Sequence, residues 1–329
     1  MTSESSPPPT VPAGTVAPLP EPAGRRANIL IALIKAVRPR QATKNLFVYT
    51  ALVFAGQLFQ TTQFLRATVG FLLFTAVAGS IYLLNDLLDV EQDRQHPKKR
   101  LRPIASGSLP VPLAWFAFVV LGLCGTAAGF RLSLLFGLTL AAYFGLQIAY
   151  CFRLKHIVLL DVFTVAAGFV LRTASGGFAI DVHISPWLML FSLQLALFLG
   201  FGKRRQELVL QGENAGKTRA ILSEYSLPFL DPMIVIVSAV TIVCYSVYSV
   251  DSPTAAAHPH LWVTVPFIIY GVCRYLYLVY QKGWGGAPDE VLLKDRELLV
   301  SVILWFLMVL LVFKFDGAGH SFFGAGGLR

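Results

Sequence analysis

Repeated apolar runs are the feature that most constrains how this chain can fold. After residue 45, stretches of nearly 20 mainly apolar residues follow one another along almost the whole sequence. A helix needs about 20 such residues to cross a bilayer. The composition agrees, because 55% of the 329 residues are hydrophobic and only 14% are charged, against roughly 25% charged residues in soluble domains. We therefore predict an all-α, polytopic membrane protein.

Nine transmembrane helices are predicted, which leaves no room for a separate soluble domain. They cover roughly residues 45–60, 67–87, 110–130, 132–151, 157–180, 185–202, 228–250, 261–281 and 298–315. The first of these is the weakest candidate, because it is short and contains Gln57.

The N-terminal region divides into two parts. Residues 1–24 are rich in Pro, Ser and Ala and lack the apolar core of a signal peptide, so they are predicted to form a disordered tail. Residues 25–329 form the predicted nine-helix domain. It opens with a helix at about 27–38 that is expected to lie in the membrane interface. The apolar positions on one face of that helix are Ile29, Ala32, Leu33, Ala36 and Val37.

The distribution of basic residues predicts the orientation in the membrane. Of the 27 Lys and Arg residues, 21 precede the first predicted span or lie in the loops after the second, fourth, sixth and eighth spans. By the positive-inside rule these segments and the N-terminus are cytoplasmic, and the inner (cytoplasmic) membrane is the expected location. Topology therefore explains most of the net charge of +9, and no nucleic-acid partner is expected.

An acidic motif stands at the cytoplasmic end of the second predicted span. In "NDLLDVEQD", Asn85, Asp86, Asp89 and Asp93 share one face if the helix continues. Like charges so close together repel, and a set of oxygen ligands suits a hard ion such as Mg²⁺. The alternative is a solvated helix end, neutralised by the bases between residues 98 and 102.

The motif and its basic continuation, "NDLLDVEQDRQHPKKRLRPIASG", resemble the first aspartate-rich signature of the UbiA superfamily of intramembrane transferases. The resemblance covers residues 27–315. It implies nine helices around a central cavity that opens sideways to lipid, with a cytoplasmic cap over a site for Mg²⁺ and a diphosphate.

One loop departs from the pattern of the superfamily. Its prenyltransferases carry a second acidic cluster after the sixth span, where this chain has Lys203, Arg204 and Arg205. This argues against a prenyl diphosphate donor, since a basic loop would bind a phosphate directly.

Segments 38–45, 154–172 and 285–299 are similar to the decaprenyl-phosphate phosphoribosyltransferase branch of the superfamily. This implies transfer of 5-phosphoribose from phosphoribosyl pyrophosphate (PRPP) to a polyprenyl phosphate, with release of pyrophosphate. The reaction is the first membrane step toward a lipid-linked arabinose donor for cell-wall arabinan. The expected partners are thus PRPP, the polyprenyl phosphate and membrane lipids; a homo-oligomer is left open.

The same resemblance assigns roles to individual residues. Asn85, Asp86, Asp89 and Asp93 would hold Mg²⁺ and the diphosphate. Asp161 would stabilise the positive charge that develops at the ribose C1, so Asp86, Asp89 and Asp161 are the catalytic candidates. The candidates for binding substrate are Arg38, Lys44, Asn45, Tyr82, Arg100, Arg102, Tyr150, Lys155, Lys203, Arg204 and Arg274.

Several of these residues have an ordinary alternative. Tyr82 and Tyr150 could be aromatic anchors at span ends instead of lining the site. Arg274, inside the eighth span, could contact a substrate phosphate or form a structural ion pair, whereas a structural role is favoured for Arg172.

Two rival functions follow from the same residues. The first is a UbiA-type prenyltransferase that attaches a polyprenyl chain to an aromatic acceptor such as 4-hydroxybenzoate, which would need a second metal cluster. The second is a transporter or flippase, for which related half-repeats with midplane charges would be expected.

Overall fold

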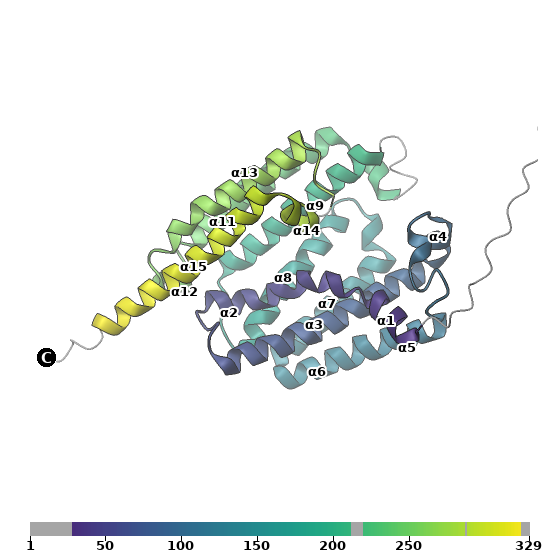
Figure 1. Cartoon of the computed structure of the whole chain (residues 1–329), viewed down its shortest axis with the longest axis horizontal. Coiled ribbons are helices and arrows are strands. Elements are labelled where there is room, and N and C mark those ends of the chain that lie inside the picture. Colours follow the sequence, from purple (N-terminus) through teal and green to yellow (C-terminus); the bar gives the residue numbers. More distant parts are fainter. Residues whose placement is uncertain (1–27, 212–219, 287, 324–329) are drawn as a thin grey trace, which may run out of the picture.

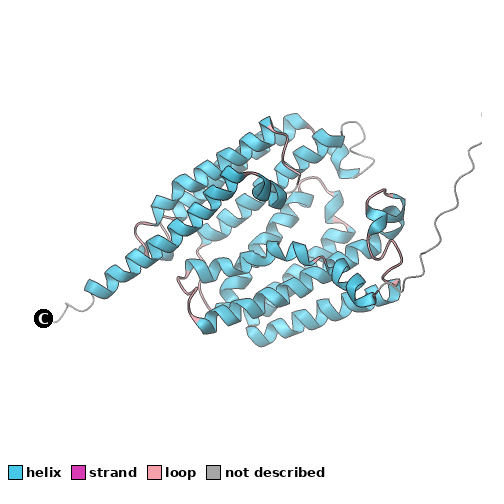
Figure 2. Ribbon diagram, viewed as in Figure 1, coloured by secondary structure: helices cyan, strands magenta, loops and turns pink. Residues whose placement is uncertain are grey.

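The computed structural model describes residues 28–211, 220–286 and 288–323 (Figure 1). In these residues all regular structure is helical, as the sequence predicts (Figure 2). The predicted disordered tail, residues 1–24, lies outside the described residues.

Eight helices in this part of the chain are long and apolar enough to cross a membrane, and they correspond to the second to ninth predicted spans. They are α3 (Thr61–Leu88), a continuous helix of α5 (Val111–Val119), a π-helical turn and α6 (Gly125–Leu132), α7 (Leu134–Phe152), α8 (Leu160–Ile180), α9 (Pro186–Gln211), α11 (Leu227–Tyr248), α13 (Val265–Gln281) with the preceding 3₁₀ turn η7 (Leu261–Thr264), and α15 (Arg296–Phe323).

The first predicted span, residues 45–60, is wrong as a membrane-length helix. The chain there forms the 3₁₀ helix η1 (Pro39–Tyr49) and the short helix α2 (Thr50–Phe54), and it then turns at Gly56 with a φ of 66°. Polar residues before position 46 and the glycine after α2 leave too short an apolar run for a span. The segment packs instead into the bundle, where Val48 and Leu52 are fully buried.

A close approach of backbones holds η1 against α8. At Gly176 of α8, a Cβ atom would lie 2.0 Å from the carbonyl oxygen of Val48, so only glycine fits there. Backbone packing therefore fixes η1, which carries the predicted substrate-binding residues Lys44 and Asn45, in the bundle.

The remaining short elements cap the ends of the bundle. They are α1 (Ile29–Val37), α4 (Val90–Gln95), the 3₁₀ turns η2 (Lys99–Leu101), η4 (Leu154–His156) and η6 (Ala220–Glu224), α12 (Pro253–Ala257) and α14 (Pro288–Lys294). Helix α1 packs through Ala32 and Ala36 and leaves Leu30 and Ile34 more than half exposed. Ala32, Leu33, Ala36 and Val37 of the predicted apolar face therefore pack within the protein, and the location of α1 at the membrane interface stays a prediction.

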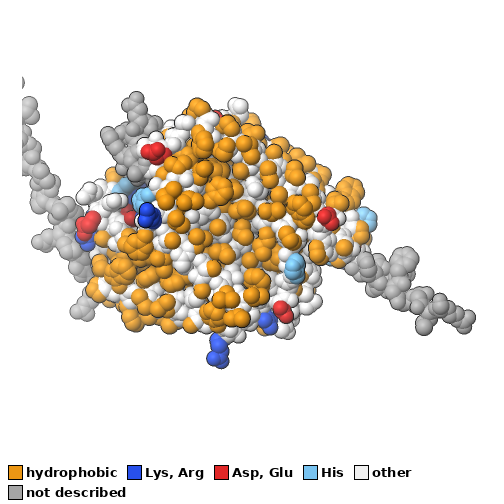
Figure 3. Space-filling model, turned by 180° about the vertical axis from the view of Figure 1, so that it is seen from behind, with side chains coloured by type: hydrophobic (Ala, Val, Ile, Leu, Met, Phe, Trp, Pro, Cys, Tyr) orange, Lys and Arg blue, Asp and Glu red, His pale blue; other side chains and the backbone are white. Residues whose placement is uncertain are grey.

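The long helices pack in two groups. Helix α3 contacts α1, α5, α6, α7 and α8, whereas α9 pairs with α11 and α13 pairs with α15. Helix α8 contacts α3, α7 and α9 and so joins the two groups, which lie side by side in Figure 1. Figure 3 shows one face of the molecule covered mainly by apolar side chains, with few charged ones, as expected for a surface in contact with lipid.

Candidate active site

The acidic motif lies where α3 ends and α4 begins. The chain bends slightly at Asp89, whose φ of −96° and ψ of 8° separate the two helices. Asp86 and Asp93 are nevertheless both 2% exposed, while the Asp89 side chain is 26% exposed. The three carboxylates therefore face the protein, as their spacing predicts, and not the solvent.

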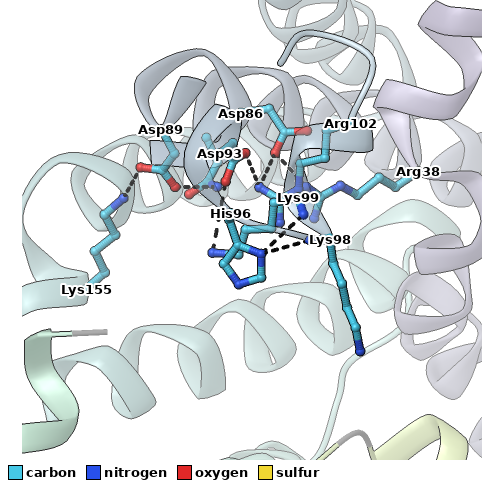
Figure 4. A network of polar contacts seen from close by, with 10 residues as sticks. Arg38, Asp86, Asp89, Asp93, His96, Lys98, Lys99, Arg102 and Lys155 are labelled. Atoms are coloured by element: carbon cyan, nitrogen blue, oxygen red, sulfur yellow. Dashed lines mark hydrogen bonds and ion pairs between the residues drawn. The ribbon is translucent and has the colours of Figure 1, made fainter. Parts of the chain in front are cut away.

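Basic side chains from three separate segments meet these acids (Figure 4). Arg38, at the end of α1, donates to Oδ1 of Asp86 at 2.5 Å. Arg102 donates to the same oxygen at 3.1 Å and to Oδ2 of Asp93 at 2.6 Å. Lys155, in the turn before α8, lies 3.1 Å from Oδ1 of Asp89. We call these six residues the acid cluster.

Local structure explains how two of the bases reach the acids. After α4 the chain turns back because Nδ1 of His96 accepts the backbone N–H groups of Lys98 and Lys99, which directs Arg102 toward α3. Arg38 has a left-handed backbone, with a φ of 56°, and its guanidinium stacks 5.1 Å from the Tyr82 ring centre.

The acid cluster has the chemistry needed for a hard metal ion. Oδ2 of Asp86 is buried and has no hydrogen-bond partner in the part of the chain that the structure describes, which is costly for an acceptor unless a ligand uses it. Asn85 donates its amide to Oδ2 of Asp89 at 3.1 Å. Over the same residues, no three His, Cys, Asp or Glu side chains gather closely enough to share one ion. The arrangement therefore fits Mg²⁺ held by one or two carboxylates together with substrate phosphates, which is its common mode.

The other predicted substrate-binding residues differ in exposure. Arg100 is exposed on η2, Lys44 is half-buried on η1, and Tyr150 is half-buried near the end of α7. The Lys203 side chain is 45% exposed, and its Nζ is 4.0 Å from a carboxylate oxygen of Glu207.

Asn45 is placed away from the acid cluster. Its amide nitrogen donates to Oγ1 of Thr75 at 3.0 Å and its Oδ1 accepts from Nε of Arg172 at 2.8 Å. Thr75 is 11 residues before Asp86 in α3, which corresponds to about 16 Å along the helix. Arg172 also donates to Tyr143. The structure thus gives Asn45 protein partners, while its contact with substrate stays a prediction, and it gives Arg172 the structural partners that the sequence favoured.

Asp161 and Arg204 pair with each other. Nε of Arg204 donates to Oδ2 of Asp161 at 2.8 Å, and the Tyr225 hydroxyl donates to Oδ1 at 2.6 Å. Asp161 is fully buried and Arg204 is 5% exposed. A second carboxylate, Glu207, accepts from Nη1 of Arg204 at 2.5 Å. Other protein groups therefore bind both Asp161, the catalytic candidate, and Arg204, the candidate for binding substrate. Both roles stay predictions.

Sequence reasoning missed Tyr225 and did not pair Glu207 with Arg204. Glu207 lies three residues after Arg204, a helical spacing that could have identified the pair. No sequence signal could have identified Tyr225, because it lies 64 residues from Asp161 and only packing brings the two together.

For Arg274, the structure shows an ion pair, and its contact with a substrate phosphate stays a prediction. Its guanidinium donates to both oxygens of Asp295, at 3.1 and 2.8 Å, and approaches Glu297 at 2.7 Å. The hydrogen bonds from Arg274 hold the pKa of Asp295 below its usual value.

Comparison with known proteins supports these features. Residues 45–205 match the profile of the UbiA prenyltransferase family. The chain is 36% identical to a decaprenyl-phosphate phosphoribosyltransferase of Mycolicibacterium smegmatis, with 86% of this chain and 92% of that protein covered. It is 35% identical to the decaprenyl-phosphate phosphoribosyltransferase of Corynebacterium glutamicum, with 87% and 88% covered.

The fold is similar to that of a UbiA homolog from Archaeoglobus fulgidus, solved with DMAPP and Mg²⁺ bound. The TM-score is 0.67 at 18% sequence identity, with 86% of this chain and 99% of that chain covered.

Proposed function

Because the chain belongs to the UbiA family, we propose that it transfers 5-phosphoribose from PRPP to a polyprenyl phosphate such as decaprenyl phosphate, in a Mg²⁺-dependent reaction. Relatives with this activity in their names align over nearly their whole length. The observation that carries the proposal is the acid cluster, in which buried carboxylates and three bases from separate segments meet at one end of the bundle.

The bases of the acid cluster match the charge of the donor. PRPP carries a diphosphate and a 5-phosphate, and Arg38, Arg102 and Lys155 are available to bind such anions, two of them with the planar guanidinium that suits phosphate. Their side chains are 17–30% exposed, so an incoming phosphate can reach them. When the substrate binds, phosphate oxygens would replace carboxylates as their partners.

Asp86 and Asp89 are the residues that would hold Mg²⁺, with Asn85 and Asp93 beside them. When bound, the ion supplies charge neutralisation for the departing pyrophosphate. In the transfer the bond from the ribose C1 to the pyrophosphate oxygen breaks, and a bond forms between C1 and an oxygen of the lipid phosphate. The lipid phosphate is already an anion, so the reaction needs no strong general base.

The rival prenyl transfer to an aromatic acceptor is less well supported. It would use a second carboxylate cluster after the sixth span, but here Arg204 occupies that region and is bound by Asp161 and Glu207. Residues 212–219 of the same loop lie outside the described residues. The names of the relatives that align over most of the chain also favour phosphoribosyl transfer. We further propose that the end of the bundle with the acid cluster faces the cytoplasm, in the inner membrane, because the donor is water-soluble.

One assay separates the two reactions. Purified protein in detergent would receive labelled PRPP, decaprenyl phosphate and Mg²⁺, and label should enter the lipid phase and be lost with EDTA. Asp86→Asn should lower this rate at least about 100-fold. The matched control is Glu91→Gln, since Glu91 lies on the next helix, α4, five residues after Asp86, but its side chain is 75% exposed and pairs only with Arg94 among the described contacts. Prenylated 4-hydroxybenzoate from a prenyl diphosphate, with PRPP inert, would contradict the proposal.

A further inference from the structure

We propose that Tyr225 is a positioning residue whose hydroxyl fixes the turn before α8 and thereby holds Lys155 over Asp89. The kinetic consequence of this inference rests on the proposed function, whereas the positioning itself can be measured without substrate.

The turn before α8 contains an unusual backbone conformation. Leu159, the residue that precedes α8, has a φ of 67° and a ψ of −44°. Side chains other than glycine rarely adopt a positive φ, and such residues persist only where the surrounding structure holds them. No side chain caps this helix end, so something else must hold the conformation.

Tyr225 supplies that constraint through one oxygen atom. Its hydroxyl accepts the backbone N–H of Leu159 at 2.8 Å and donates its own proton to Oδ1 of Asp161 at 2.6 Å. The side chain is 4% exposed and packs in the core formed by α8, α9, α11 and α13. Burial and the Asp161 carboxylate raise the pKa of the Tyr225 hydroxyl, so it keeps the proton that it donates.

The contact joins segments that are distant in the sequence. Tyr225 follows η6, Leu159 ends the turn after η4, and Asp161 is bound in turn by Arg204 of α9. The Tyr225 hydroxyl therefore links the start of α8 to the segment after η6, and Asp161 links it to α9.

Lys155 is carried by the same turn. It lies four residues before Leu159, and its Nζ is 3.1 Å from Oδ1 of Asp89, across the site on α3. The position of this ammonium group depends on the path of residues 156–159, because α7 holds the other end of the turn. Loss of the Tyr225 hydroxyl would free Leu159 from its rare conformation and let Lys155 move away from Asp89.

Tyr225→Phe tests this directly, because it removes only the hydroxyl. The matched control is Tyr245→Phe. Tyr245 is also buried, and its hydroxyl also makes two hydrogen bonds, with Thr264 and Trp305, but it lies in another core cluster. The first readout is the rate at which an amine-modifying reagent labels Lys155, followed by mass spectrometry, in protein without substrate.

The Lys155 side chain is 17% exposed, so we expect Tyr225→Phe to raise its labelling about fivefold and Tyr245→Phe to leave it unchanged. An unchanged Lys155 rate in a folded Tyr225→Phe protein, or an equal rise in both variants, would overturn the inference. This readout holds whatever reaction the protein catalyses, so it can fail or succeed independently of the proposed function.

The second readout is a kinetic cycle between Tyr225 and Lys155. Tyr225→Phe should lower kcat/KM for PRPP about tenfold without changing KM for the lipid acceptor. Combined with Lys155→Met, it should add nothing beyond Lys155→Met alone, since both act on the same ammonium group. Additive effects would show that Tyr225 acts by another route, through Asp161 or through stability, and not through Lys155.

Discussion

Two buried aspartates near the same end of the bundle use arginine in different ways. Asp86 accepts from Arg38 and Arg102 through one oxygen, and its other oxygen has no partner among the described residues. Asp161 accepts from Arg204 and Tyr225, so both of its oxygens are used.

The arginines that pair with Asp86 are also more exposed than the arginine that pairs with Asp161. The side chains that pair with Asp86 are 30% and 25% exposed, whereas that of Arg204 is 6% exposed. An ion pair with an unused oxygen and reachable partners can accept a ligand, while breaking a fully bonded and buried pair leaves a charge without its partner. The comparison therefore distinguishes an Asp–Arg pair that keeps an acceptor oxygen from one whose two carboxylate oxygens are both bonded.

The largest expected effect is on the stability of Asp161→Asn. It would leave Arg204 buried with Glu207 as its remaining carboxylate partner, and breaking a buried ion pair costs about 3 kcal/mol. The thermal unfolding midpoint in detergent should therefore fall clearly, and it should change much less for Asp86→Asn. A stable but inactive Asp161→Asn protein would instead support the electrostatic role at the ribose C1 that the sequence predicts.

A smaller effect is expected when the shape of a phosphate-binding cation changes. Arg102 bridges Asp86 and Asp93, and lysine cannot reproduce its planar fork. Arg102→Lys should raise KM for PRPP about tenfold with little change in the unfolding midpoint. Arg94→Lys is the control, because Arg94 pairs with exposed Glu91. Equal changes in the two variants would show that the acid cluster does not bind the donor.

Asn45→Ala should destabilise the protein without changing PRPP binding. The variant removes the acceptor for Nε of buried Arg172 and the donor to Thr75, which costs about 1–3 kcal/mol. The unfolding midpoint and KM for PRPP would be measured together. A higher KM for PRPP with an unchanged midpoint would instead support the predicted contact between Asn45 and substrate.

The smallest effect concerns pH and the pair between Arg274 and Asp295. The pKa of Asp295 is lowered in the folded protein, so this pair contributes stability above the ordinary Asp pKa of about 3.9. That contribution is lost as the pH falls through the lower, folded-state pKa. The difference in unfolding midpoint between wild type and Asp295→Asn should therefore be larger at pH 7 than at pH 3. A difference that grows at low pH would mean that the sign of the shift is wrong.

The parts of the site that could be predicted are those set by local spacing. Asp86, Asp89 and Asp93 lie within two turns of helix, so their shared face follows from helical geometry alone. The bases Arg38, Arg102 and Lys155 could be named from the resemblance, and the structure brings all three to the acids. The roles given to Arg204 and Asn45 did not anticipate Asp161 and Arg172 as their partners, because these partners lie 43 and 127 residues away and nothing in the local sequence identifies them.

By itself, the sequence determined the membrane class, eight of the spans and the acidic face at the end of α3, because apolar length and helical periodicity are local properties. Only the tertiary structure decided how η1 and α2 pack, because the close approach of the Val48 backbone to Gly176 joins segments that are far apart in the sequence. It also decided which acids keep an oxygen for a ligand. A long guanidinium side chain can reach several acceptors. The choice among them is made by the packing of residues that are 43 positions apart for Asp161 and Arg204 and 127 apart for Asn45 and Arg172.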